Sequence, residues 1–274
     1  MAGFLRSFFR MSSKVLGRLA IVLTALLGAF PNEAAAQWTD RRLIAGQVGF
    51  GIAASFFGKI LIAHESPGEA LKEAVVEGAA WGMVAHSGYT ITGKHPELAL
   101  LGKTIAQKSA LMGHRSVRGE PVFDKSLYSH WALTHSFIYF EFRGRPHVEI
   151  DAVNAGFSVY YLLTDPYQLD LGRTLYGGSL VFRNPSPPPG HRGFYVPGVI
   201  WLDAARLRNK SIFAHELIHS LQTERGATFA DWHYRGFRFN LLAFTNGAPA
   251  LLEGWPDHQK RPHEREANLY AGRK

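Results

Sequence analysis

The stretch that decides the fold is residues 211–222, which read Ser-Ile-Phe-Ala-His-Glu-Leu-Ile-His-Ser-Leu-Gln. Apolar residues recur in it at helical spacing, so the sequence predicts a helix with a buried face. His215 and His219 are four residues apart and therefore share one face of that helix. Both imidazoles can reach a single metal ion, with Glu216 held beside it.

A third ligand must come from His, Asp or Glu, because the chain has no cysteine. The favoured residue is Glu266, which shares a helix face with Leu269 and Tyr270 and would point toward the core. Glu264 is an alternative, although its place in the first turn after Pro262 already has an explanation in the helix dipole. The sequence therefore predicts a Zn²⁺ site of His215, His219 and Glu266.

Other residues near the motif are weaker candidates. Asp231, twelve residues after His219, is a further alternative third ligand. His233, Tyr234 and Tyr270 could stabilise a developing oxyanion, although each is also a common packing residue.

Two segments together resemble a known family: HELIHSLQ at His215–Gln222 and PHEREANLYA at Pro262–Ala271. The pair is similar to the gluzincin-type zincin metallopeptidases, in which HExxH is completed by a glutamate on a later helix. It also resembles exported bacterial proteins that pair HEL-x-H-x-x-Q with an E-x-E-A helix. The resemblance implies peptide hydrolysis by a zinc-activated water, with Glu216 as general base. It does not extend to residues 43–190.

The middle of the chain alternates apolar and polar residues with period two, which is typical of strands. The predicted strands are residues 137–142, 148–153, 157–163, 175–182 and 194–202. Turn sequences border the first three of these predicted strands, so we expect an antiparallel meander. The last strand directly precedes the histidine helix and could align a peptide beside it.

The first third of the chain predicts a glycine-rich helical module, residues 37–119. Leu43–Ala63 is apolar, long enough to span a bilayer, and rich in small residues that allow close helix packing. We therefore expect either a membrane contact or a tightly packed helix there. Ser66 predicts the cap of the next helix, and a second helix is expected at Pro96–Met112, ending at Gly113.

Residues 1–36 have the features of a secretory signal peptide. A basic stretch ends at Arg18, an apolar run covers Leu19–Phe30, and Ala34-Ala35-Ala36 matches a cleavage site before Gln37. An uncleaved anchor is the alternative. Either way we expect an exported protein, periplasmic or envelope-associated, or else secreted.

The net charge of +8 does not indicate a nucleic-acid partner, because the Lys and Arg residues beyond the signal are scattered. Only 19% of residues are charged, which is low for a globular protein. We interpret the positive charge as favouring solubility or contact with an envelope surface.

These observations predict an α+β protein with a helical N-terminal module, an antiparallel β meander and zincin-like C-terminal helices within residues 120–274. The leading function is an exported zinc metallopeptidase acting on a peptide or protein. The alternative is a noncatalytic envelope protein with a structural or vestigial zinc site. A fourth protein ligand, Asp231 or His233, would favour the alternative, because structural zinc sites are closed.

Overall fold

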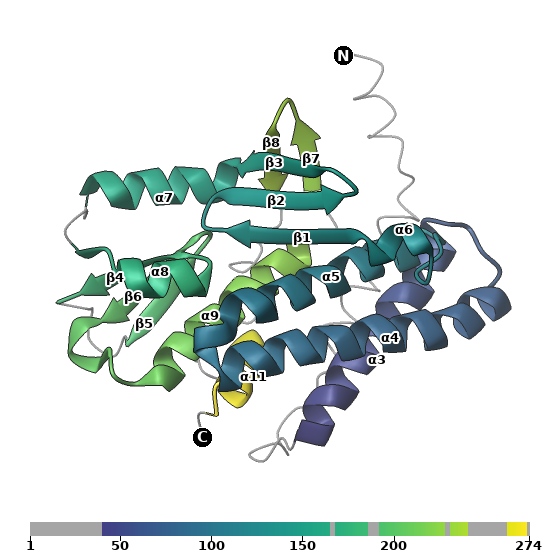
Figure 1. The fold of residues 1–274 in the computed structure, drawn as a ribbon. Helices are drawn as coiled ribbons and strands as arrows, with labels where there is room; N and C mark the ends of the chain where they lie inside the picture. Colours follow the sequence, from purple (N-terminus) through teal and green to yellow (C-terminus); the bar gives the residue numbers. More distant parts are fainter. Residues whose placement is uncertain (1–39, 165–167, 186–191, 228–230, 241–261, 273–274) are drawn as a thin grey trace, which may run out of the picture. The chain divides into compact units, whose positions relative to one another are not determined.

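A computed structural model describes residues 40–164, 168–185, 192–227, 231–240 and 262–272. The predicted signal peptide lies outside this range. Helices and two small sheets together make the α+β architecture that the sequence predicts (Figure 1). Residues Thr39–Lys274 form one compact unit.

Three helices build the N-terminal layer: α3 (Asp40–Leu61), α4 (Pro67–Lys94) and α5 (Ala99–Val117), with a short 3-10 helix at Pro96–Leu98. The predicted cap is confirmed, since Ser66 accepts a hydrogen bond from the Glu69 amide at 3.4 Å and donates one to its carboxylate at 2.8 Å. The predicted stop at Gly113 is wrong. Helix α5 continues for another turn, and the chain reverses at Gly119, whose φ of +70° suits glycine.

Close packing of α3 on α4 depends on glycine, as the small-residue pattern predicts. A Cβ atom added at Gly51 would lie 2.1 Å from the carbonyl oxygen of Gly78. Any larger residue at either position would therefore force the two backbones apart.

Helix α3 is also long and apolar enough to cross a membrane, over Leu43–Leu61, with a third of that window buried in the structure. It nevertheless carries a buried ammonium group, that of Lys59. This group contacts three carboxylates: Glu73, Glu77 at 3.3 Å and Glu65 at 3.4 Å. These contacts tie α3 to α4 within the protein.

The larger sheet contains the first two predicted strands, 137–142 and 148–153, and adds a strand before them that the sequence does not predict. Strands β1 (His130–His135), β2 (Ile138–Arg143) and β3 (Pro146–Asp151) are antiparallel, and the short helix α6 (Lys125–Tyr128) precedes them. The hairpin of β7 (Asp231–Tyr234) and β8 (Phe237–Asn240) extends this sheet, with β8 parallel to β3. The strand order is β1-β2-β3-β8-β7, so the sheet is mixed, whereas the sequence predicts an antiparallel one.

The smaller sheet holds β4 (Leu180–Asn184), β6 (Val199–Asp203) and β5 (Gly193–Val196), in that order. The single strand predicted at 194–202 is instead a hairpin of β5 and β6, turning at Gly198 with a φ of +78°. Similarly, the strand predicted at 175–182 divides between the end of α8 (Leu171–Gly177) and β4.

The strand predicted at 157–163 is wrong, because those residues lie in α7 (Ala152–Thr164). Asp151 accepts a hydrogen bond from the Asn154 amide at 3.0 Å at the start of this helix. Phe157 and Tyr161, four residues apart, both pack on the core of the smaller sheet. Their spacing fits one helix face, and tertiary packing outweighs the β propensity of the aromatic run.

Helix α9 (Lys210–Ala227) carries the His-Glu-x-x-His sequence and packs against α4, α5, β5 and α11 (Pro262–Tyr270). Leu217, Ile218 and Leu221 are fully buried. A buried carboxylate of the same helix, Glu224, lies 3.1 Å from the Lys103 ammonium of α5 and accepts a hydrogen bond from Gln107 at 2.5 Å. These contacts hold α9 in the centre of the fold.

Candidate metal centre

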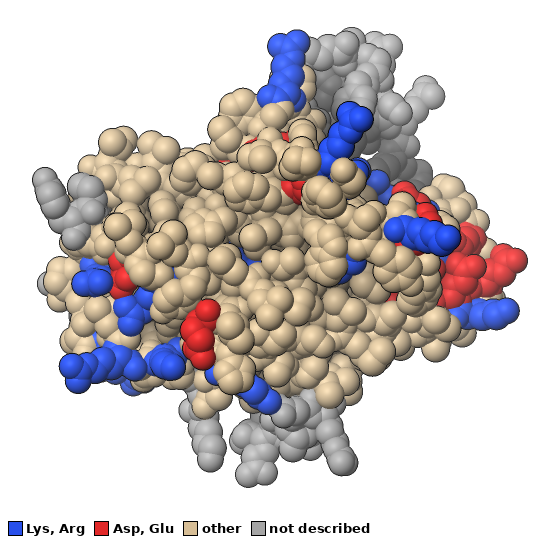
Figure 2. Space-filling model, in the orientation of Figure 1, with Lys and Arg blue, Asp and Glu red and all other residues tan. Residues whose placement is uncertain are grey.

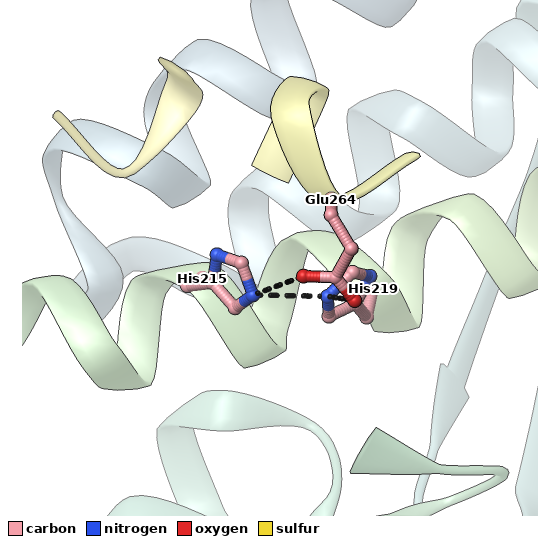
Figure 3. Close-up of side chains that lie close together, drawn as sticks. All are labelled: His215, His219 and Glu264. Carbon is pink, nitrogen blue, oxygen red and sulfur yellow. Dashed lines mark hydrogen bonds and ion pairs between the residues drawn. The ribbon is translucent and has the colours of Figure 1, made fainter. Parts of the chain in front are cut away.

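Three buried side chains from α9 and α11 converge on one point: His215, His219 and Glu264 (Figure 3). The Nε2 atoms of the two histidines are 3.0 Å apart. The Glu264 carboxylate lies 3.1 Å from Nε2 of His215 and 3.3 Å from Nε2 of His219. Two ligands of a tetrahedral zinc ion, each about 2.0–2.1 Å from it, are about 3.3 Å apart. The three groups are therefore close enough together to hold one metal ion.

The third member of the cluster is Glu264, the alternative residue, whereas the favoured residue, Glu266, lies outside it. Residues two positions apart on a helix point about 200° apart around its axis, so only one of the two can reach the histidine pair. The carboxylate of Glu266 accepts hydrogen bonds from Gln47 of α3 at 2.6 Å and from Gln222 of α9 at 2.7 Å. Arg225 lies 3.7 Å from it. Glu266 therefore ties α11 to its neighbours.

Electrostatics within the cluster couple the three groups. Burial raises the pKa of the Glu264 carboxyl, but hydrogen bonds from His215 and His219 outweigh burial and hold it well below its usual value. Burial lowers the pKa of His219, yet the hydrogen bond to Glu264 and the charge of Glu216 raise it on balance. The site thus favours a cation between its ligands, either a proton or a metal ion.

Gln222, the last residue of the HELIHSLQ segment, to which the sequence alone gives no role, orients His219. Its side-chain oxygen lies 2.8 Å from Nδ1 of His219. Its Nε2 donates to the carbonyl of His263 at 3.0 Å and to Glu266, which fixes the oxygen as the atom facing the ring. Nδ1 must then carry the proton, so that Nε2 of neutral His219 offers a lone pair to the cluster. Gln222 follows His219 by three residues on one helix, and this spacing is the sequence signal that could have predicted their contact.

Glu216 is buried and faces strand β5. A Cβ atom added at Gly193 of β5 would lie 2.8 Å from Oε1 of Glu216, so the carboxylate contacts the strand backbone there. Glu216 therefore lies between α9 and β5, whereas Glu264 approaches the histidines from α11.

Within the part of the chain that the structure describes, none of the remaining candidates belongs to this cluster. His233 belongs to the larger sheet, with Nδ1 2.5 Å from the Glu149 carboxylate. Tyr234 is on the same hairpin and is half exposed. The hydroxyl of Tyr270 lies 2.9 Å from Nδ1 of His86, and burial raises its pKa. Asp231 begins β7, and its side chain is outside the described part of the structure. No fourth ligand joins the cluster among the described residues.

No family profile, curated protein or solved structure matches this chain.

Proposed function

We propose that this protein is an exported zinc-dependent metallopeptidase of the gluzincin type. One observation carries the proposal: the buried convergence of His215, His219 and Glu264, with Glu216 on the same helix. Three protein ligands of the N,N,O type are the set that catalytic zinc sites use, whereas structural sites have four.

In this proposal His215, His219 and Glu264 hold the ion. Bound Zn²⁺ polarises a carbonyl group and lowers the pKa of water. Gln222 keeps His219 in the tautomer that binds through Nε2. Glu216 accepts the proton of the attacking water and returns it to the leaving amine, as a general base and then a general acid.

Strand β5 supports peptides as the substrate class. Among the described strands β5 pairs only with β6, so one of its edges has no described strand beside it. An extended peptide can add to such an edge through main-chain hydrogen bonds. The Glu216 carboxylate contacts β5 at Gly193, so a peptide on this edge would pass close to the general base.

The second candidate function is a noncatalytic envelope protein with a structural zinc site. The burial of the cluster favours it, because the side chains of His215 and Glu264 are only 7% and 8% exposed. A substrate must reach the ion of a peptidase, whereas a structural ion needs no access.

Zinc content and hydrolysis, measured on the same variants, separate the two functions. We expect about one zinc per purified chain, lost in His215→Ala and Glu264→Ala and retained in Glu216→Gln. Peptidase activity on a mixed peptide library should disappear in all three variants. Zinc retained with no hydrolysis in the wild type favours the structural function, and a folded wild type without zinc overturns both.

A further inference from the structure

The five-stranded sheet has its polar face inside and its apolar face outside. Thr134, Tyr139, Glu149, Asp151 and Arg238 are all at most 5% exposed and point toward α5 and the interior. Together with α5, this inner face lines a cavity of about 200 Å³. The apolar residues of the same strands must therefore point outward.

The outer face is continuous across all five strands. Cross-strand pairs place Trp131 beside Phe142, Phe140 beside Val148, Ile150 beside Phe237, and Phe237 beside Tyr234. We call these seven residues the outer apolar face: Trp131, Phe140, Phe142, Val148, Ile150, Tyr234 and Phe237. Each is between 40% and 54% exposed. Soluble monomers rarely expose so many adjacent large apolar side chains without a partner.

Among the described residues, the exposed charged groups at the turns of this sheet are positive. The described carboxylates of the sheet, Glu141, Glu149 and Asp151, share the inner face and are largely buried. Exposed arginines stand at two turns, Arg145 between β2 and β3 and Arg235 between β7 and β8. The guanidinium of Arg235 lies 5.2 Å from the ring centre of Tyr234. A surface that complements this face is therefore apolar beneath and negatively charged at its rim.

An anionic bilayer has this combination, with acyl chains beneath a layer of phosphates. Trp131 lies on one edge strand and Tyr234 on the other, and both types of ring suit the boundary between the two layers. We propose that the outer apolar face docks on the surface of an anionic phospholipid bilayer. This inference is independent of the proposed peptidase activity. In Figure 2, drawn in the orientation of Figure 1, an uncharged area covers the middle of the view, over α4 and α5, and Lys and Arg lie mainly toward its margins.

Vesicle flotation of the full chain tests the proposal, with vesicles of phosphatidylcholine alone or mixed with phosphatidylglycerol. We expect binding to the mixed vesicles that weakens at high salt. The double variant Phe140→Ser/Val148→Ser should bind at least about tenfold more weakly. Arg145→Gln/Arg235→Gln should bind the mixed vesicles about 30-fold more weakly, since each basic residue near an anionic surface contributes about fivefold. These arginines are at turns, so this variant tests the proposal even if the serine variant fails to fold.

The matched control is Ile44→Ser/Ile62→Ser, on α3 and directly after its last residue, where the two side chains are 39% and 58% exposed. It should leave binding unchanged. The proposal is overturned if the wild type does not float, if all variants float equally, or if only the α3 variant loses binding. It is also overturned if the wild type is a dimer in solution and the Phe140/Val148 variant is a monomer, because a second copy then covers the face.

Discussion

Replacing Glu264 by glutamine should weaken zinc binding by about two orders of magnitude. The substitution keeps the shape of a side chain that is 6% exposed and removes its negative charge. At an effective dielectric constant of about 20, a unit charge about 4 Å from another contributes about 4 kcal/mol, hence about 8 kcal/mol for a divalent ion. Desolvation and the amide oxygen offset most of this energy. If a third of the roughly 8 kcal/mol remains, the affinity for zinc falls about 100-fold.

Competition with a chromophoric chelator measures this affinity on the purified chain, and circular dichroism shows whether each variant is folded. Glu266→Gln is the matched control, because it is the same substitution two residues along α11. An amide oxygen there can still accept from Gln222, so affinity should change less than about tenfold. The reasoning is refuted if Glu264→Gln binds zinc as tightly as the wild type, or if Glu266→Gln has the larger effect.

Three further changes test the surroundings of the ligands. Gln222→Ala should lower zinc affinity about 10- to 100-fold without unfolding the chain, because His219 loses the acceptor that selects its tautomer; an unchanged affinity in the same chelator competition would contradict that role. Gly193→Ala should displace the Glu216 carboxylate and reduce peptide hydrolysis while zinc content stays at the wild-type level, and full activity would show that the carboxylate does not need its place beside β5. In the metal-free protein the pKa of His219 is raised, so its pairing with Glu264 stabilises the fold. This stabilisation is complete below about pH 6.5, the pKa of a free histidine, and is lost as the pH rises through the raised pKa of His219. The melting temperature in the presence of a chelator should therefore decrease as pH rises above 6.5, and a profile identical to that of Glu264→Gln would exclude the pair as its cause.

The fold shows where local sequence patterns suffice. The cap at Ser66 and the antiparallel pair of β2 and β3 follow from residues close together in the chain, and both are present, whereas β1 is not predicted. The sequence predicts a strand at 157–163 instead of a helix, because the apolar residues there fit the two-residue repeat of a strand as well as the four-residue spacing of a helix face. Asp151 at its start and the core of the smaller sheet select the helix.

The pairing of β8 with β3 joins residues that are far apart in the sequence, Ile150 with Phe237. No local pattern specifies such a pairing. The same limit applies to the outer apolar face. Alternation predicts that a strand has an apolar side, but whether that side faces the interior depends on what packs against the sheet. Here α5 presents Gln107 to the sheet, where it donates to Thr134 at 2.8 Å, so the polar side is the buried one.

The spacing of His215, Glu216 and His219 within about one helical turn predicts two of the proposed ligands and the adjacent acid, because the geometry of a helix is known in advance. The third proposed ligand depends on the tertiary structure. The sequence favours Glu266 over Glu264, but the choice depends on how α11 is oriented, and Gln47, more than two hundred residues away, helps to orient it by binding Glu266. A helix fixes the directions of its side chains relative to one another, whereas its rotation about its own axis is fixed by its neighbours.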